Sequence, residues 1–318
     1  MVKRLTFVST LLLCAGVSHA LAAEFPLKQP IRIVVGANPG GGTDVLARIT
    51  AEALQRRLGQ PVVVLNKPGA GASLAVDQVA KAAPDGHTLL LIFNELVALA
   101  AVRNNLPYKV DELTFLIRPF TYQPMLFGSP KKPYASATDL VAAMKANPGN
   151  IKYGSTGVGA VIHLGLAMFE SATGTKGLHV PYTGIAPVYQ DLLAGTIDFA
   201  EGTPPSLDGV KALASVGPKR SHLFPNVPTL EEMGIKGATW EAWSGFLAPP
   251  NLPKPIADRL IAEIDAVIKD PETIAKYQAS GKVTPDAQPL TGEAFKKAAL
   301  DELKRWKVVV DREKIVIE

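Results

Sequence analysis

Cysteine is almost absent from this chain of 318 residues, in which Cys14 is the only one. It lies in an N-terminal segment with a basic start, an apolar run and small residues in A-x-A spacing at Ala20 and Ala22. This pattern predicts a secretory signal peptide over residues 1–23 rather than a membrane span, because the apolar run is too short and a cleavage site follows it. Cleavage there would leave no cysteine, which excludes disulfides, thiol nucleophiles and thiolate metal sites. Lipidation of Cys14 is the alternative, but it requires a small residue where Leu13 stands.

A strong charge of either sign is also lacking. Without Lys3 and Arg4, 31 basic residues stand against 29 acidic ones, a net charge of about +2. This balance gives no reason to expect a nucleic-acid partner. No later apolar run approaches the roughly 18–20 residues that cross a bilayer. The mature protein is therefore expected to be soluble in the periplasm.

The motifs of common enzyme and metal sites are missing as well. There is no G-x-S-x-G nucleophile elbow, no H-E-x-x-H and no other histidine pair at ligand spacing. We therefore expect no catalytic residue, no metal and no cofactor. An enzyme would need a general base, for which His163, Asp44, Glu95 and Glu201 are the candidates.

One pattern is present twice. Strand, glycine-containing turn, helix, strand, turn, helix and strand follow one another from about Ile31 and again from about Ile151. This alternation predicts two α/β units, each with a parallel sheet. Ligands of such sheets bind beyond the carboxyl ends of the strands, where these turns lie. The four turns are therefore candidates for one shared cleft.

Two segments are predicted to cross between the units. The Pro-punctuated apolar stretch 110–134 follows the first unit, and the stretch 239–253, which carries Trp240, follows the second. The helical remainder is assigned to the first domain, so that two crossover strands form a hinge. The predicted fold class is α/β, a two-domain periplasmic-binding-protein (Venus flytrap) fold, with domain 1 at residues 24–121 and 240–318 and domain 2 at residues 122–239.

The first turn has the sequence GANPGGGTD and spans Gly36–Asp44, between a buried strand and an amphipathic helix. A glycine-rich turn before a helix cradles an anion on backbone N–H groups. Val45 replaces the third glycine of a dinucleotide fingerprint, and no Gly-Lys-Ser/Thr follows the glycines as a P-loop requires. Lys67 is the only basic residue in the four turns, whereas phosphate sites recruit arginine or lysine. The turns therefore suit a small carboxylate.

Four polar residues near the turns allow more than one interpretation. Asp44 either stabilises its own loop or contacts the ligand directly. His163 satisfies the backbone of the adjacent turn, orients the loop that touches the ligand, or takes part in catalysis. Glu95 and Glu201 follow strands in corresponding positions of the two units. Each alone is read as a solvated surface residue, whereas as a pair across a cleft they would favour a ligand with a cationic or hydrogen-donating group opposite its carboxylate.

The chain carries in order the blocks PGGGTDVLARITAEALQRRLGQPVVVLNKPGAGASLAVDQVAKAAPDGHTLLL, YGSTGVGAVIHL, VPYTGIAPVYQDLLAGTID and FPNVPTLEEMG. Over essentially the whole mature chain it resembles the periplasmic solute-binding proteins of tripartite tricarboxylate transporters, the Bug-type receptors. The resemblance implies two domains that close on a small organic acid, and docking on a membrane permease with one large and one small subunit. It implies that the loops 39–44 and 155–159 pinch the carboxylate, with Thr183 and Gly184 in the same cleft. A monomer is expected, because such a receptor must open and close.

The sequence departs from the family pattern in both loops. Ala37 stands where the first loop often carries an aromatic residue, and Ala160 and Val161 stand where the second often carries serines. An enlarged pocket with one apolar wall predicts a bulkier carboxylate with an apolar body. A receptor that presents its ligand to a membrane signalling partner is the alternative function. The predicted ligand-binding residues are Ala37, Asn38, Gly41, Gly42, Thr43, Asp44, Asn94, Glu95, Ser155, Thr156, Gly157, Gly159, Ala160, Val161, His163, Thr183, Gly184 and Glu201.

Overall fold

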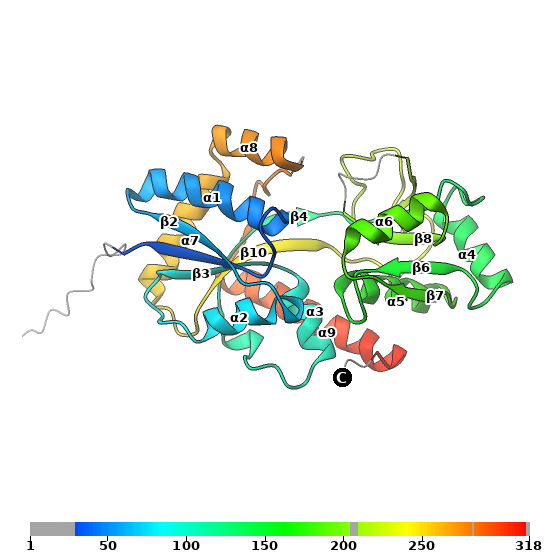
Figure 1. The fold of residues 1–318 in the computed structure, drawn as a ribbon, viewed down its shortest axis with the longest axis horizontal. Coiled ribbons are helices and arrows are strands. Elements are labelled where there is room, and N and C mark those ends of the chain that lie inside the picture. The colour runs from blue at the N-terminus through cyan, green and yellow to red at the C-terminus, as the bar shows by residue number, and fades with distance from the viewer. Residues whose placement is uncertain (1–28, 204–208, 282, 316–318) are drawn as a thin grey trace, which may run out of the picture.

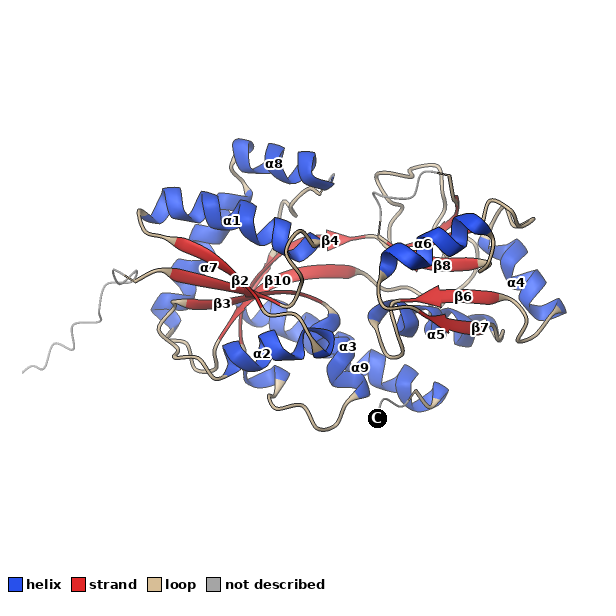
Figure 2. Ribbon diagram, in the orientation of Figure 1, coloured by secondary structure: helices blue, strands red, loops and turns tan. Residues whose placement is uncertain are grey.

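The structure is a computed structural model that describes residues 29–203, 209–281 and 283–315. The predicted signal peptide and Cys14 lie outside these residues. The described chain forms two lobes, each built on one sheet with helices on both of its faces (Figures 1 and 2). The sheet of the first lobe draws its strands from both ends of the chain, and that of the second lobe draws them from the middle.

The first sheet has a parallel part and an antiparallel part. Its first three strands in the chain are parallel, as the alternating pattern predicts, and the return strand joins them antiparallel. In sheet order the strands are β11 (Leu290–Thr291), β4 (Thr114–Tyr122), β10 (Ala242–Ala248), β3 (Thr88–Phe93), β1 (Ile31–Val35) and β2 (Val62–Asn66). The helices of this lobe are α1 (Gly42–Leu58), α2 (Ser73–Ala80), α3 (Glu95–Val102), α7 (Lys254–Ile268), α8 (Pro271–Gly281) and α9 (Gly292–Glu313), with short 3-10 turns η1 (Ala70–Ala72) and η2 (Val110–Glu112).

Strand β1 is buried on both faces, which explains its nearly continuous apolar sequence. Ile31, Ile33 and Val35 pack into the core beneath α1, α7 and α8, whereas Val34 packs into the opposite core with α2, α3 and α9. Successive side chains of a strand point to opposite faces, so one strand supplies both cores.

The second sheet repeats this arrangement on a smaller scale. In sheet order its strands are β7 (Leu178–Pro181), β6 (Lys152–Ser155), β8 (Phe199–Gly202), β5 (Met125–Gly128) and β9 (Lys211–Ser215). Its helices are α4 (Ala137–Ala146), α5 (Val161–Thr173) and α6 (Ile185–Ala194). Strand β6 is parallel to β7 and β8, whereas β5 runs antiparallel to β8 and β9. Helix α6 covers a small core on one face, and α4 and α5 belong to the core on the other.

Strands β4 and β10 are antiparallel partners and lead the chain from one lobe to the other and back. In Figure 1 they run side by side through the middle of the molecule. Helix α9 also packs against α5, so one buried core continues across both lobes on this side. The domain limits 24–121 with 240–318, and 122–239, remain a prediction, although the strands of the second sheet all fall within residues 125–215.

A buried carboxylate fastens the return strand. Glu302 of α9 is 5% exposed and accepts hydrogen bonds from Trp243 Nε1 at 2.5 Å, Trp306 Nε1 at 2.9 Å and Asn94 Nδ2 at 2.9 Å. Burial raises the pKa of Glu302, and the three donors oppose that rise by stabilising the charge. The carboxylate thereby joins α9 to β10 and to the first turn of α3.

Close packing of β10 on α9 generates a stability prediction. A Cβ added at Gly245 would lie 2.3 Å from Cζ of Phe295, an approach that side chains do not tolerate. We expect Gly245→Ala to lower the free energy of unfolding by about 1–3 kcal/mol through overpacking. Thermal or urea unfolding measures the loss, with Gly184→Ala as the control, because a Cβ there meets no atom within 4 Å. Equal stability of the two variants would contradict the packing described for β10.

Candidate functional site

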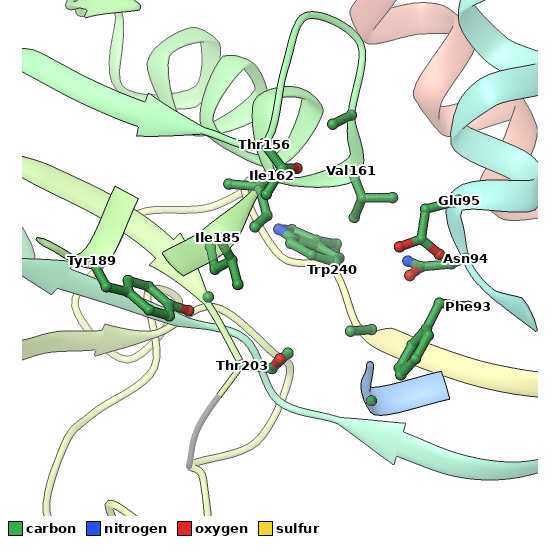
Figure 3. Close-up of a pocket in the computed structure, with 14 residues that line it drawn as sticks. Phe93, Asn94, Glu95, Thr156, Val161, Ile162, Ile185, Tyr189, Thr203 and Trp240 are labelled. Carbon is green, nitrogen blue, oxygen red and sulfur yellow. The ribbon is translucent and has the colours of Figure 1, made fainter. Parts of the chain in front are cut away.

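A cavity of about 430 Å³ opens between the two lobes. Both lobes and the return segment contribute to its wall, and Figure 3 shows the side chains converging from these three directions. Two smaller cavities, of about 220 and 200 Å³, adjoin it and share wall residues with it. We call the three together the cleft. The main cavity is lined by Gly42, Phe93, Asn94, Glu95, Thr156, Ala160, Val161, Ile162, Ile185, Tyr189, Gly202, Thr203, Trp240 and Ala242.

The first glycine loop is tied down from behind by Asp44. This side chain is 1% exposed and accepts hydrogen bonds from the Gly40 N–H at 2.8 Å, Arg48 Nε at 2.9 Å and Asn66 Nδ2 at 2.8 Å. Asn66 also donates to the carbonyl of Ala37, on the other side of the loop. Burial opposes ionisation of Asp44, but the hydrogen bonds from Arg48, Gly40 and Asn66 outweigh it and hold its pKa below the usual value. Of the two interpretations of Asp44, the geometry matches the loop-stabilising one.

The second glycine loop rests on two stacked imidazoles. His163 and His179 lie with ring centroids 4.0 Å apart and planes 8° from parallel. Nδ1 of His163 accepts the N–H of Gly159 at 3.0 Å, and Nε2 of His179 is 2.7 Å from Oγ of Ser155. The Ser155 hydroxyl also bonds the backbone of Gly157. Histidine and serine therefore shape the loop from beneath rather than facing the cavity.

Neutral imidazole is what this loop requires. Burial, followed by the neighbouring His179 and Lys176, lowers the pKa of His163 to about 4. Near neutral pH the ring is therefore uncharged, which leaves Nδ1 free to accept from Gly159. Among the three interpretations of His163, satisfying the backbone of the adjacent turn is the one that its contacts describe.

The predicted site residues divide into two groups. Those that line the cleft are Ala37, Gly42, Thr43, Asn94, Glu95, Thr156, Gly157, Gly159, Ala160 and Val161. Those not among the lining residues are Asn38, Gly41, Asp44, Ser155, His163, Thr183, Gly184 and Glu201. Gly184 caps α6 and directly precedes Ile185, which does line the main cavity. Within the second group, Asp44, Ser155 and His163 hold the two glycine loops in place.

The structure contradicts the sequence-based interpretation of Glu201. The sequence suggests either a solvated surface residue or one member of a pair with Glu95 across the cleft, but the Glu201 side chain is fully buried in β8. Its Oε2 accepts the indole N–H of Trp240 at 3.1 Å, and its Oε1 has no partner among the described residues. Gly165 of α5 leaves room for this pair, because a Cβ there would lie 2.3 Å from Oε2. The indole of Trp240 borders the cavity, and the carboxyl that it bonds does not.

Sequence reasoning missed most of the apolar wall. Ile185 and Tyr189 lie one helical turn apart on α6, a spacing that would have placed both on one face. The sequence indicates Trp240 only as part of a crossing segment. No sequence signal distinguished four further lining residues of the cleft from core or surface residues: Phe93, Ile162, Thr203 and Arg103.

The cleft suits recognition rather than reaction. Its main cavity combines apolar and aromatic side chains with a few polar groups and the N-termini of α1 and α5. Across residues 29–203, 209–281 and 283–315, no group of three or more acidic, histidine or cysteine side chains could hold a metal ion.

In the same part of the chain, no helix is long and apolar enough to cross a membrane.

The contact between His163 and Gly159 predicts a pH-dependent stability. His163→Ala removes the acceptor of a buried N–H and should lower the free energy of unfolding by about 1–3 kcal/mol. His163→Asn should retain more stability, because its Oδ1 stands near the position of Nδ1. The wild type should also lose stability as pH falls from about 6.5 to about 4, where the unfolded chain binds a proton on this ring and the folded chain does not. Urea unfolding across this range tests both points, and a wild-type loss unchanged by either substitution would contradict them.

The buried Glu201 predicts the opposite trend. Burial raises the pKa of this carboxyl to about 8, against the single hydrogen bond from Trp240. As pH rises from about 5 to about 8, the unfolded chain ionises and the folded chain stays protonated, so stability contributed by this group is lost. Relative to Glu201→Gln, the wild type should lose about 2–4 kcal/mol over this window. Exposed Glu293→Gln is the control, and parallel curves for wild type and Glu201→Gln would contradict the burial.

Comparison with known proteins agrees with this geometry. Residues 46–315 match the family model described as tripartite tricarboxylate transporter family receptor. BugT of Bordetella pertussis is 32% identical over 98% of this chain and 97% of its own. The structure of MatC from Rhodopseudomonas palustris with bound malate is 27% identical and covers 90% of this chain and 100% of its own, with a TM-score of 0.75. The structure of Rpa4515 from R. palustris with adipate is 26% identical and covers 92% and 99%, with a TM-score of 0.79.

These matches bear directly on fold and class. The two-lobed architecture is the two-domain fold of periplasmic binding proteins, as the sequence predicts. Members of this family are periplasmic solute-binding receptors and not enzymes. The chain belongs to the family of tripartite tricarboxylate transporter receptors, the Bug-type solute-binding proteins.

Proposed function

We propose that this receptor captures a small organic carboxylate with an apolar body between its lobes and delivers it to a membrane permease. The observation that carries the proposal is the cavity between the lobes, where the N-termini of two helices meet an apolar wall. Gly42 begins α1 in the first lobe, and Val161 begins α5 in the second. The first N–H groups of a helix have no partner within the helix and favour an anion.

The apolar wall supports a ligand with a hydrophobic body. Ile162 and Ile185 of the second lobe and Trp240 of the return segment line the main cavity. No arginine or lysine is among the described residues that line it, so its anion contacts are dipolar and hydroxylic. Malate and adipate in the related structures are both small carboxylates, of which adipate has the longer apolar chain. Contacts from both lobes to one ligand would favour a closed state by their differential affinity.

Export and delivery complete the proposal. We propose that residues 1–23 are removed as a signal peptide and that domain 1 (24–121 and 240–318) and domain 2 (122–239) close as two bodies. The loaded monomer would then dock on a permease with one large and one small subunit. Affinity capture from detergent-solubilised membranes tests the partner. Recovery of a signalling protein in place of a permease would favour the sensor function instead.

Backbone donation by α5 can be tested with one pair of variants. Val161→Pro deletes the N–H at the first position of α5, where proline fits, and Ala160 has the extended conformation that a following proline requires. We expect the variant to bind carboxylates roughly tenfold or more weakly, the loss of one charge-assisted hydrogen bond. Val161→Ala keeps the N–H and is the matched control. Calorimetry with mono- and dicarboxylates of different apolar bodies measures the effect; equal affinities of the two variants, or tight binding of citrate alone, would overturn the assignment.

A further inference from the structure

One carboxylate lies where the three cavities of the cleft meet. Glu95 lines the main cavity of about 430 Å³ and both adjoining cavities. It is the first residue of α3, directly after Asn94, whose side chain is fastened to Glu302. Figure 3 shows the Glu95 carboxylate directed into the space that Trp240 and Val161 border. The hydrogen bond between Asn94 and Glu302 therefore fixes the position of Glu95 in the first lobe, and the Glu95 carboxylate faces the main cavity.

No cationic side chain of the described residues pairs with the Glu95 carboxylate. No hydrogen bond or ion pair joins the Glu95 side chain to another side chain in residues 29–203, 209–281 and 283–315. Among the described residues that line the main cavity, Glu95 is the only charged one. Arg103 lines the smallest of the three cavities, but it follows the last residue of α3, and the backbone positions of Glu95 and Arg103 are about 12 Å apart at 1.5 Å per helical residue. The N-terminal dipole of α3 supplies about half a positive charge, which leaves the site negative.

The surroundings make this isolated charge unfavourable. Glu95 is exposed to solvent in the open cleft. Desolvation by the surrounding protein nevertheless raises the pKa of its carboxyl, against a hydrogen bond from its own backbone N–H. Closure of the lobes around a ligand would remove the remaining water. An ionised carboxylate enclosed without a partner is strongly disfavoured, and a ligand carboxylate beside it would add repulsion. Either the ligand donates a hydrogen bond to the Glu95 carboxylate, or Glu95 weakens binding of the ligand.

The cavity therefore has two poles: one favours an anionic group of the ligand, and the other favours a cationic or hydrogen-donating group. N–H groups at the starts of α1 and α5 can donate hydrogen bonds to an anion, and the Glu95 carboxylate can accept them from a donor. The apolar wall of Ile185 and Trp240 lies in the same cavity. The ring of Phe93, two residues before Glu95, lines this cavity beside it, and aromatic faces attract cations. A ligand that matches both poles carries a carboxylate and a cation on one apolar body.

We infer that Glu95 is a specificity-determining residue that selects carboxylates bearing an ammonium group separated from the carboxylate by an apolar body. The inference rests on the proposed function and names the ligand class for the same cleft. Glu95 accepts the ammonium N–H groups, while the helix N-termini hold the carboxylate. A dicarboxylate without a donor is disfavoured at this pole.

Matched ligand pairs test the inference by calorimetry. Hexanoate is compared with 6-aminohexanoate, and 4-methylbenzoate with 4-(aminomethyl)benzoate, so that each pair differs by one amino group. In the wild type we expect the amino member of at least one pair to bind tenfold or more tightly than its partner. Glu95→Gln should reduce that ratio to within threefold, and Glu95→Ala should do the same. Exposed Glu293→Gln, which removes the same charge from α9, should leave the ratio unchanged.

Each other outcome has a defined meaning. A wild-type preference for the amino-free member, or a ratio that survives both Glu95 variants while their thermal unfolding stays normal, overturns the inference. Tight binding of adipate that is stronger at low pH would overturn it as well, because Glu95 would then act as a protonated donor. If other carboxylates bind and neither amino member does, the inference fails and the proposed function stands. If no carboxylate binds at all, both fail.

Discussion

The buried carboxylate of Glu302 is the contact on which the cleft depends. It accepts hydrogen bonds from α3, β10 and its own helix α9, three segments that are far apart in the sequence. Through Asn94 it fixes the start of α3, and through Trp243 it fixes the return strand two residues before Gly245. Both segments contribute residues to the wall of the cleft, Asn94 and Glu95 from one and Ala242 from the other. A carboxylate can do this because it accepts several donors at once, and each donor is held by a different element.

Both glycine loops are held in place by side chains that do not line the cleft. Asp44 holds the first loop and the pair of His163 and His179 holds the second, and none of the three side chains lines the cleft. Ligand-facing positions are left to backbone groups and small or apolar residues such as Gly42 and Ala160. This division keeps the loops in place while the N–H groups at their ends remain available. It also explains why charged and polar residues at these loops do not imply catalysis.

The crossover segment between the lobes carries two tryptophans that are hydrogen-bonded to buried carboxylates. Trp240 is bonded to Glu201 of the second lobe, and Trp243 is bonded to Glu302 of the first. The segment between the lobes is thus attached on each side by one indole and one buried carboxylate. Trp240 also forms part of the cavity wall, so one side chain links the position of the crossover segment to the shape of the cavity. The continuous core between α5 and α9 adds a further constraint on how the lobes can separate.

The sequence alone determined the class of the fold and predicted where its ligand binds. The repeated strand, turn and helix pattern follows from local periodicity, and the two glycine loops follow from the backbone requirements of a strand-to-helix turn. Only the tertiary structure decided which side chains face the cavity. Glu95 and Glu201 occupy corresponding positions after strands, yet one opens into the cleft and the other is buried beneath Trp240 and Gly165. That difference depends on segments 36 to 39 residues away in the chain, and contacts at such separation leave no periodic signal in the sequence.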